Sequence, residues 1–228
     1  MGAVAAMGFP AIVPASVFGQ TAPSNRINVG AIGVGRISRG HDLPGIWQFD
    51  QAQIMAVCDL DAKRVDQAKT LIDGVYSKKT GKPYDGVTGY HNYHELLANK
   101  DIDAVVISTP DHQHAIVAVD AVHAKKDVYL QKPASLTIAE GRAMSNAVMA
   151  SGQILQIGSQ QRSWKQFHRA CELVRNGRIG EVKHVEIGLP GDPSGPDAPP
   201  MPIPSNLNYG FHPGGLLHRD AGSPAGWI

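Results

Sequence analysis

The feature that most constrains this chain is an apolar run that meets a glycine-spaced turn, I-N-V-G-A-I-G-V-G-R-I-S-R at residues 27–39. It predicts a buried parallel strand, a tight turn and then a helix. Glycine lets the backbone approach a pyrophosphate closely, and the first N–H groups of a helix attract phosphate. The third small position of the G-x-G-x-x-G pattern is Ser38, so by itself the segment is equally consistent with a plain tight turn. If it binds a dinucleotide, the contacting residues are Gly33, Gly35, Arg36 and Ile37.

A second apolar run, I-M-A-V at residues 54–57, is followed by Asp59, at roughly the 20-residue spacing expected for the acid that binds the adenosine ribose. A carboxylate there accepts hydrogen bonds from the ribose hydroxyls and repels a 2′-phosphate, which favours NAD over NADP. Lys63 and Arg64 lie nearby and can weaken that preference, so NADP stays open. The alternative is that Asp59 only caps the next helix, but Asp61 is the better cap.

The overall composition argues against several classes of protein. The chain has 228 residues and is 43% hydrophobic, which is enough for a substantial core. It has 21 basic and 20 acidic residues and only 6% aromatic residues, a balance that argues against a nucleic-acid partner. After residue 20, no segment approaches the roughly 20 apolar residues of a membrane span. Cys58 and Cys171 are the only cysteines, so a disulfide framework is excluded.

The first 20 residues are apolar, rich in small side chains and uncharged. They resemble the later part of a secretory signal without its basic start, which predicts a periplasmic protein whose natural chain begins upstream. Pro10 and Pro14 argue against a membrane helix. The alternative is an apolar arm that packs on the fold or on a partner, in a cytoplasmic protein.

Beyond the glycine turn, apolar strand patterns alternate with helical patterns. This predicts an α/β fold, a doubly wound parallel Rossmann sheet followed by the start of an incomplete α+β substrate domain. The later strands are expected at 104–108, 128–130, 153–157 and 181–187, and the helices at 61–73, 93–99, 114–125, 138–150 and 163–176. Residues 74–89, rich in Gly, Lys, Pro and Asp, are expected to form a long loop. The resulting division is a signal-like segment and linker (1–25), a dinucleotide-binding domain (26–150) and a truncated second domain (151–228).

Polar side chains follow the predicted strands, at the edge where such sheets bind ligands. Thr109 and Pro110 come after the cleanest strand, and the Thr109 hydroxyl can bind a phosphate or ribose. His112 and His114 follow, but side chains two apart at a helix start diverge and no third ligand is suitably spaced, so we expect no metal site. Lys132 ends the next strand, where its charge can stabilise an alkoxide; the alternative is an ordinary exposed lysine.

As a set, these segments resemble the Gfo/Idh/MocA family, the glucose–fructose oxidoreductase and inositol dehydrogenase group, over roughly residues 25–187. V-G-A-I-G-V-G resembles the family's cofactor turn, and A-V-C-D-L-D resembles its second strand with the ribose-binding acid. S-T-P-D-H-Q-H resembles its T-P-x-x-x-H element, and K-K-D-V-Y-L-Q-K-P the strand that ends in its E-K-P motif. G-S-Q-Q-R and L-V-R-N-G-R-I-G-E-V resemble its crossing into the substrate domain.

The resemblance implies a nicotinamide-dependent oxidoreductase that acts on a sugar, cyclitol or related polyol. Besides the glycine turn and Asp59, the cofactor contacts it implies are Thr109, Pro110, His114, Gln131, Lys132 and Arg162, with Lys132 also the catalytic candidate. The family usually has glutamate in place of Gln131, so one carboxylate near the cofactor is missing.

The family's catalytic base is expected to be a histidine of the second-domain sheet, through which members commonly associate into homo-oligomers. Most of that sheet is absent, and the resemblance fades after residue 209, so we expect a truncated reading frame. His212 and His218 lie in this tail and are not assigned as the base. Two alternatives stay open: an NAD-dependent glycoside hydrolase or lyase that recycles its cofactor, and a non-catalytic dinucleotide-binding fragment.

Overall fold

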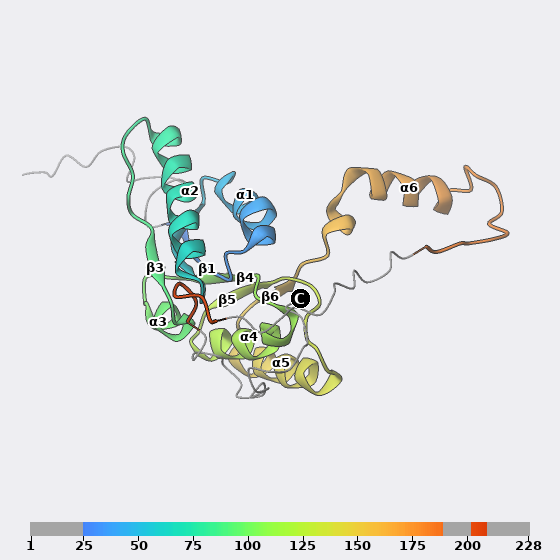
Figure 1. The fold of residues 1–228 in the computed structure, drawn as a ribbon. Helices are drawn as coiled ribbons and strands as arrows, with labels where there is room; N and C mark the ends of the chain where they lie inside the picture. The colour runs from blue at the N-terminus through green and yellow to red at the C-terminus, as the bar shows by residue number, and fades with distance from the viewer. Residues whose placement is uncertain (1–24, 189–201, 209–228) are drawn as a thin grey trace, which may run out of the picture.

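The computed structural model describes residues 25–188 and 202–208 (Figure 1). The signal-like segment at 1–24 lies outside the described residues. So do most of the Pro- and Gly-rich region and the tail that contains His212 and His218.

Six strands form one parallel sheet in the order β3-β2-β1-β4-β5-β6. The strands are β1 (Ile27–Ile32), β2 (Ala52–Cys58), β3 (Thr88–Tyr90), β4 (Ala104–Ile107), β5 (Asp127–Leu130) and β6 (Leu155–Ile157). The order reverses between β1 and β4, which is the topological switch point where doubly wound sheets bind their ligands. The predicted fold class is confirmed.

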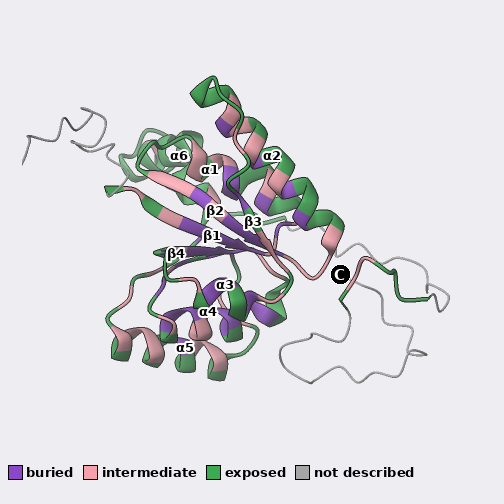
Figure 2. Cartoon of the chain, turned by 90° about the vertical axis from the view of Figure 1, so that its left-hand side faces the viewer, coloured by how far each residue is buried: buried purple, intermediate pink, exposed green. Residues whose placement is uncertain are grey.

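Helices cover both faces of the sheet, as Figure 2 shows. One apolar core lies between the sheet and α1 (Leu43–Trp47) and α2 (Ala62–Thr80). A second core lies under α3 (Tyr93–Ala98), α4 (His114–His123) and α5 (Ile138–Ser151). Three short helical segments, η3 (Ser38–Asp42), η4 (Asp111–Gln113) and η5 (Gln160–Ser163), complete the connections. The central strands are apolar on both sides because both of their faces are buried.

The expected loop at 74–89 is wrong at both ends, since residues 74–80 are helical and residues 88–89 belong to β3. Helix α2 continues through Gly74 to Thr80 and ends at Gly81, which has a left-handed φ of 69°. Its second half is stabilised by packing, because Tyr76 is buried and its hydroxyl accepts a hydrogen bond from the backbone N–H of Ile54 (2.8 Å). Tertiary contact therefore outweighs the low helix propensity of Gly74.

The chain after β6 differs from the body of the molecule. The sheet includes β6, which lies beyond the expected domain boundary at residue 150. Helix α6 (Lys165–Arg175) then projects away from the sheet (Figure 1), and none of its residues is buried. The expected strand at 181–187 is wrong, since these exposed residues pair with no other strand of the described part of the chain. No helix in that part is both long and apolar enough to cross a bilayer.

Candidate functional site

The glycine turn after β1 is built so tightly that its first position accepts no side chain. Gly33 has a φ of 81°, and a Cβ placed on it would lie 2.7 Å from the backbone of Ser108 and Thr109. A Cβ on Gly35, in contrast, would approach only the Arg64 guanidinium, at 3.8 Å. The backbone of Gly35 therefore faces open space, which is the close approach that a pyrophosphate needs. Ser38 is 1% exposed, so the imperfect third position of the motif is filled by a small, buried side chain.

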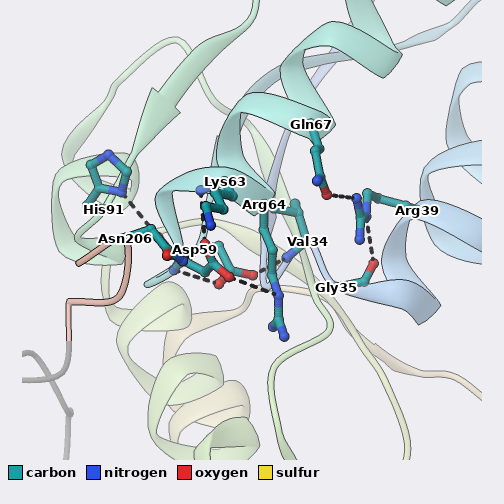
Figure 3. Close-up of polar contacts among 10 residues, drawn as sticks. Val34, Gly35, Arg39, Asp59, Lys63, Arg64, Gln67, His91 and Asn206 are labelled. Atoms are coloured by element: carbon teal, nitrogen blue, oxygen red, sulfur yellow. Dashed lines mark hydrogen bonds and ion pairs between the residues drawn. The ribbon is translucent and has the colours of Figure 1, made fainter. Parts of the chain in front are cut away.

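Asp59 follows the end of β2, and its side chain points toward the glycine turn (Figure 3). Its Oδ2 accepts a hydrogen bond from the backbone N–H of Val34 (2.9 Å), and its Oδ1 accepts one from the N–H of Asp61 (3.0 Å). Helix α2 is capped instead by Asp61, whose side chain accepts from the N–H of Lys63 (2.9 Å). The prediction that Asp61, and not Asp59, caps this helix is confirmed. A carboxylate held by backbone donors is fixed in place and keeps lone pairs free for hydroxyl groups.

Basic side chains surround the same turn. Arg39 donates from Nε to the carbonyl of Gly35 (3.3 Å), and its Nη1 contacts Gln67 of α2. Arg64 is exposed and lies 3.7 Å from a carboxylate oxygen of Asp61 (Figure 3). Arg36 and Ile37 begin the helical segment after the turn and are also exposed. The phosphate side of the site is thus positively charged, although Arg39 was not among the predicted contacts.

A small pocket opens beside Asp59 at the carboxyl ends of β1, β2 and β4. Leu60, His91, Tyr93, Thr109, Gln113 and Val117 contribute to its lining. The Thr109 hydroxyl is buried and has no hydrogen-bond partner among the described residues. Burial, reinforced by the charge of Asp59, raises the pKa of the Cys58 thiol to about 12, so this cysteine is an apolar wall rather than a nucleophile.

His114, one of the cofactor contacts that the resemblance implies, is buried. The ring is 1% exposed. Its Nε2 lies 2.8 Å from the carbonyl oxygen of Thr109, and its Nδ1 lies 2.5 Å from that of Pro133. The histidine therefore connects the loop after β4 to the loop after β5, and it supports the site from beneath. Pro110 is exposed at the start of the β4 loop.

A buried polar cluster lies at the carboxyl ends of β4 and β5. Gln131 is 5% exposed, and its Nε2 donates to Oδ1 of Asp42 at 2.6 Å. The hydroxyl of Ser108 donates to Oδ2 of the same carboxylate, also at 2.6 Å. The Gln131 oxygen accepts from the backbone N–H of Lys132 (3.2 Å), whose side chain is exposed. A carboxylate is thus present next to position 131, although it comes from Asp42 and not from residue 131 itself.

Besides Arg39, sequence reasoning missed Asp42 and Asn206. Asp42 follows Ser38 by one helical turn, and both side chains are buried, which only the structure reveals. Asn206 belongs to the described segment 202–208, which lies against the end of β2. Its Nδ2 donates to Oδ1 of Asp61 (2.7 Å), and its carbonyl accepts from the N–H of Ala62 (2.8 Å). Residues so far apart in sequence carry no local signal.

Arg162 is the one predicted contact that the structure does not bring to the site. It lies exposed on η5, where the chain leaves the body of the molecule toward α6 (Figure 1). Within the described segments, no three His, Cys, Asp or Glu side chains are grouped as a metal site requires. The assembled site therefore consists of the glycine turn, the two acids Asp59 and Asp42, and the loops after β4 and β5.

Comparison with known proteins gives a consistent picture. The model of the GFO_IDH_MocA family, described as an oxidoreductase family with an NAD-binding Rossmann fold, matches residues 27–159, more than half of the chain. The uncharacterized oxidoreductase YrbE of Bacillus subtilis is 30% identical over 194 residues, which are 85% of this chain and 50% of that protein. Inositol 2-dehydrogenase of Salmonella typhimurium is 29% identical over 158 residues, 68% of this chain and 43% of the enzyme.

Two further matches are a glycosyl hydrolase and a solved dehydrogenase structure. A glycosyl hydrolase family 109 protein of Shewanella woodyi is 28% identical over 172 residues, 75% of this chain and 36% of that protein. The crystal structure of myo-inositol 2-dehydrogenase from Lactobacillus plantarum superimposes with a TM-score of 0.58 at 26% identity, covering 69% of this chain and 43% of the enzyme. The chain spans half or less of the length of these relatives.

Proposed function

Because the chain belongs to the Gfo/Idh/MocA oxidoreductase family, we propose that it binds NAD and that the whole protein transfers a hydride between this cofactor and a sugar, cyclitol or related polyol. One observation carries the proposal. The Asp59 carboxylate is hydrogen-bonded to the turn that follows β1, so the ribose acid and the pyrophosphate turn form a single preorganised unit. The inositol dehydrogenases among the relatives support the substrate class.

The described residues would divide the binding of the cofactor between them. Gly33 and Gly35 shape the backbone at the pyrophosphate, and the first N–H groups of the helix face the phosphates. Asp59 accepts the hydroxyls of the adenosine ribose, and the unpartnered Thr109 hydroxyl is a further donor. Bound NAD supplies the hydride acceptor. Lys132, exposed at the end of β5, would orient the substrate hydroxyl and stabilise negative charge on its oxygen.

The same geometry favours NAD over NADP. The 2′-phosphate of NADP would lie next to the fixed Asp59 carboxylate, and two neighbouring negative charges repel strongly. Arg64 lies close to the turn and is exposed, so it reduces this repulsion without removing it. We expect tighter binding of NADH than of NADPH.

The test is direct titration of the purified chain with NADH and with NADPH, in which binding is measured by fluorescence and calorimetry. Changing Asp59→Asn removes the charge but keeps an acceptor for Val34. NADH affinity should fall about tenfold, the equivalent of one lost charged hydrogen bond, and the ratio of NADPH to NADH affinity should rise. Asp66→Asn, on the exposed side of α2, is the matched control and should change neither value. Absence of binding to both cofactors would refute the proposal.

A panel of polyols and sugars then tests the hydride transfer itself. NADH formation with a member of the panel supports the dehydrogenase. Binding of NADH without oxidation of any polyol supports a dinucleotide-binding module without activity of its own.

The family 109 relatives favour a second candidate, a glycoside hydrolase that oxidises and re-reduces its sugar within one turnover. Such an enzyme releases a sugar without net NADH. Incubation with nitrophenyl glycosides, with absorbance followed at the wavelengths of both nitrophenol and NADH, separates the two candidates. Nitrophenol release at constant NADH supports the hydrolase.

A further inference from the structure

Asp42 is a buried acid without a cationic partner. Its side chain is 9% exposed, and its two oxygens accept from Ser108 and Gln131, both of which are neutral. No Lys, Arg or His among the described residues lies within ion-pair distance of this carboxylate. Buried charges in proteins are normally paired because removing them from water is costly. The structure thus holds a negative charge that a bound cation would compensate.

The position of Asp42 in the fold indicates which part of a ligand would meet this charge. Asp59 ends β2, on one side of the switch point, whereas Ser108 and Gln131 follow β4 and β5, on the other side. In a doubly wound sheet the two halves of a dinucleotide lie across this switch point. With the adenosine ribose at Asp59, the other nucleoside lies over the half of the sheet that contains Asp42.

The charge of Asp42 is felt at this edge of the sheet. Tyr129 is the residue of β5 that precedes Leu130, and its pKa is raised first by burial and second by the Asp42 carboxylate. Lys132, which follows Gln131, is exposed and forms no ion pair with Asp42. On this side of the site, a buried carboxylate therefore lies beneath an exposed lysine.

We infer that Asp42 sets the preference of the site for the oxidised cofactor, because the nicotinamide ring is cationic in NAD⁺ and neutral in NADH. This inference rests on the proposed binding of NAD. Asp42 would act through the negative charge of its carboxylate and would not contact the substrate. Ser108 and Gln131 each donate a hydrogen bond to one oxygen of the Asp42 carboxylate, so both the position and the orientation of this group are fixed.

The experiment compares the dissociation constants of NAD⁺ and NADH, by calorimetry and fluorescence, in the wild-type chain and in Asp42→Asn. Removing one charge at short range in an environment of intermediate dielectric should weaken NAD⁺ relative to NADH by roughly tenfold. The double variant Asp42→Asn/Gln131→Glu returns one carboxylate to the same cluster and should restore the ratio. Asp50→Asn, an exposed acid on the surface, is the control and should leave the ratio unchanged.

The outcomes separate the inference from the proposed function. If the wild-type chain binds neither form, the proposed function fails before the ratio is measured. If both forms bind and the ratio is the same in Asp42→Asn, the inference is wrong while the proposed function stands. Ser108→Ala keeps the charge and removes one donor, so a shifted ratio in this variant and an unshifted one in Asp42→Asn would also overturn the inference. Thermal unfolding of each variant confirms that the measured protein is folded.

Discussion

Asp59 and Asp42 are both carboxylates at the carboxyl edge of the sheet, yet they are held by different means. Asp59 accepts from backbone N–H groups, which any sequence provides once the turn is formed. Asp42 accepts from the side chains of Ser108 and Gln131, so its environment depends on those two residues. Substitution at either partner would change the Asp42 environment but leave Asp59 untouched.

Gly33 provides the sharpest prediction for a single residue. Gly33→Ala should lower the free energy of unfolding by about 1–3 kcal/mol, because the new Cβ meets backbone atoms and the φ of 81° is strained for alanine. NADH binding should be lost with it. Gly40→Ala is the control, since its Cβ would meet nothing within 4 Å and helical alanine is favoured. Urea unfolding of both variants measures the difference, and equal stability would contradict the interpretation.

The sequence identified the residues whose role follows from a local pattern. Gly33 and Asp59 were found because the spacing from strand to turn to acid is fixed by the fold. Asp42 was missed because its partners lie 66 and 89 residues away, a separation that no local pattern reveals. His114 was identified by its motif, but only the structure shows that its ring is buried between two carbonyl groups.

Among the elements, the helices were predicted where an apolar stripe or a cap marks them. Helix α5 begins at a capping box between Thr137 and Glu140, and it was expected within one residue of its observed bounds. The second half of α2 was missed because Gly74 interrupts the pattern and the stabilising contact comes from Tyr76. Propensity therefore located the helices, and tertiary packing decided how far they extend.

The capping box of α5 can be tested at the level of this helix. Thr137→Ala removes the hydroxyl that accepts from the N–H of Glu140 (3.2 Å), and it should lower the free energy of unfolding by about 1 kcal/mol. Glu140→Gln keeps an oxygen that can accept from the N–H groups of Leu136 and Thr137, so it should be nearly neutral. Thermal unfolding monitored by circular dichroism compares the two. A loss in Glu140→Gln as large as that in Thr137→Ala would contradict the prediction, because it would show that the charge of Glu140 matters as much as the Thr137 hydroxyl.

For the molecule as a whole, the doubly wound parallel sheet with helices on both faces followed from the alternation of strands and helices in the sequence, whereas the edge strand β3 was not predicted. After β6, the helix expected at 163–176 is present as α6, but the strand expected at 181–187 is not, and no residue of α6 is buried. Trp164 and Phe167 are each 47% exposed, and Val174 is 43% exposed. A strand or helix predicted from its pattern forms a stable layer only when another surface covers its apolar face.

The exposed face of α6 leads to a prediction about association of the 228-residue chain. Phe167→Glu should leave the unfolding temperature unchanged, because the side chain packs against little, but it should reduce self-association in analytical ultracentrifugation. Leu96→Ala is the contrasting variant: Leu96 is fully buried, and its truncation should cost about 2–5 kcal/mol of stability. A large drop in unfolding temperature for Phe167→Glu would show that α6 is packed in solution.

The bridge formed by His114 has a mechanical consequence for the molecule. Because the buried imidazole ring lies between the carbonyl oxygens of Thr109 and Pro133, separation of the two loops would leave its N–H without an acceptor, at about 1–3 kcal/mol. Any shift of the backbone at Thr109 is therefore transmitted to the turn that carries Lys132. The position of Lys132 therefore depends on the position of the loop that contains Thr109, although these two residues share no direct contact.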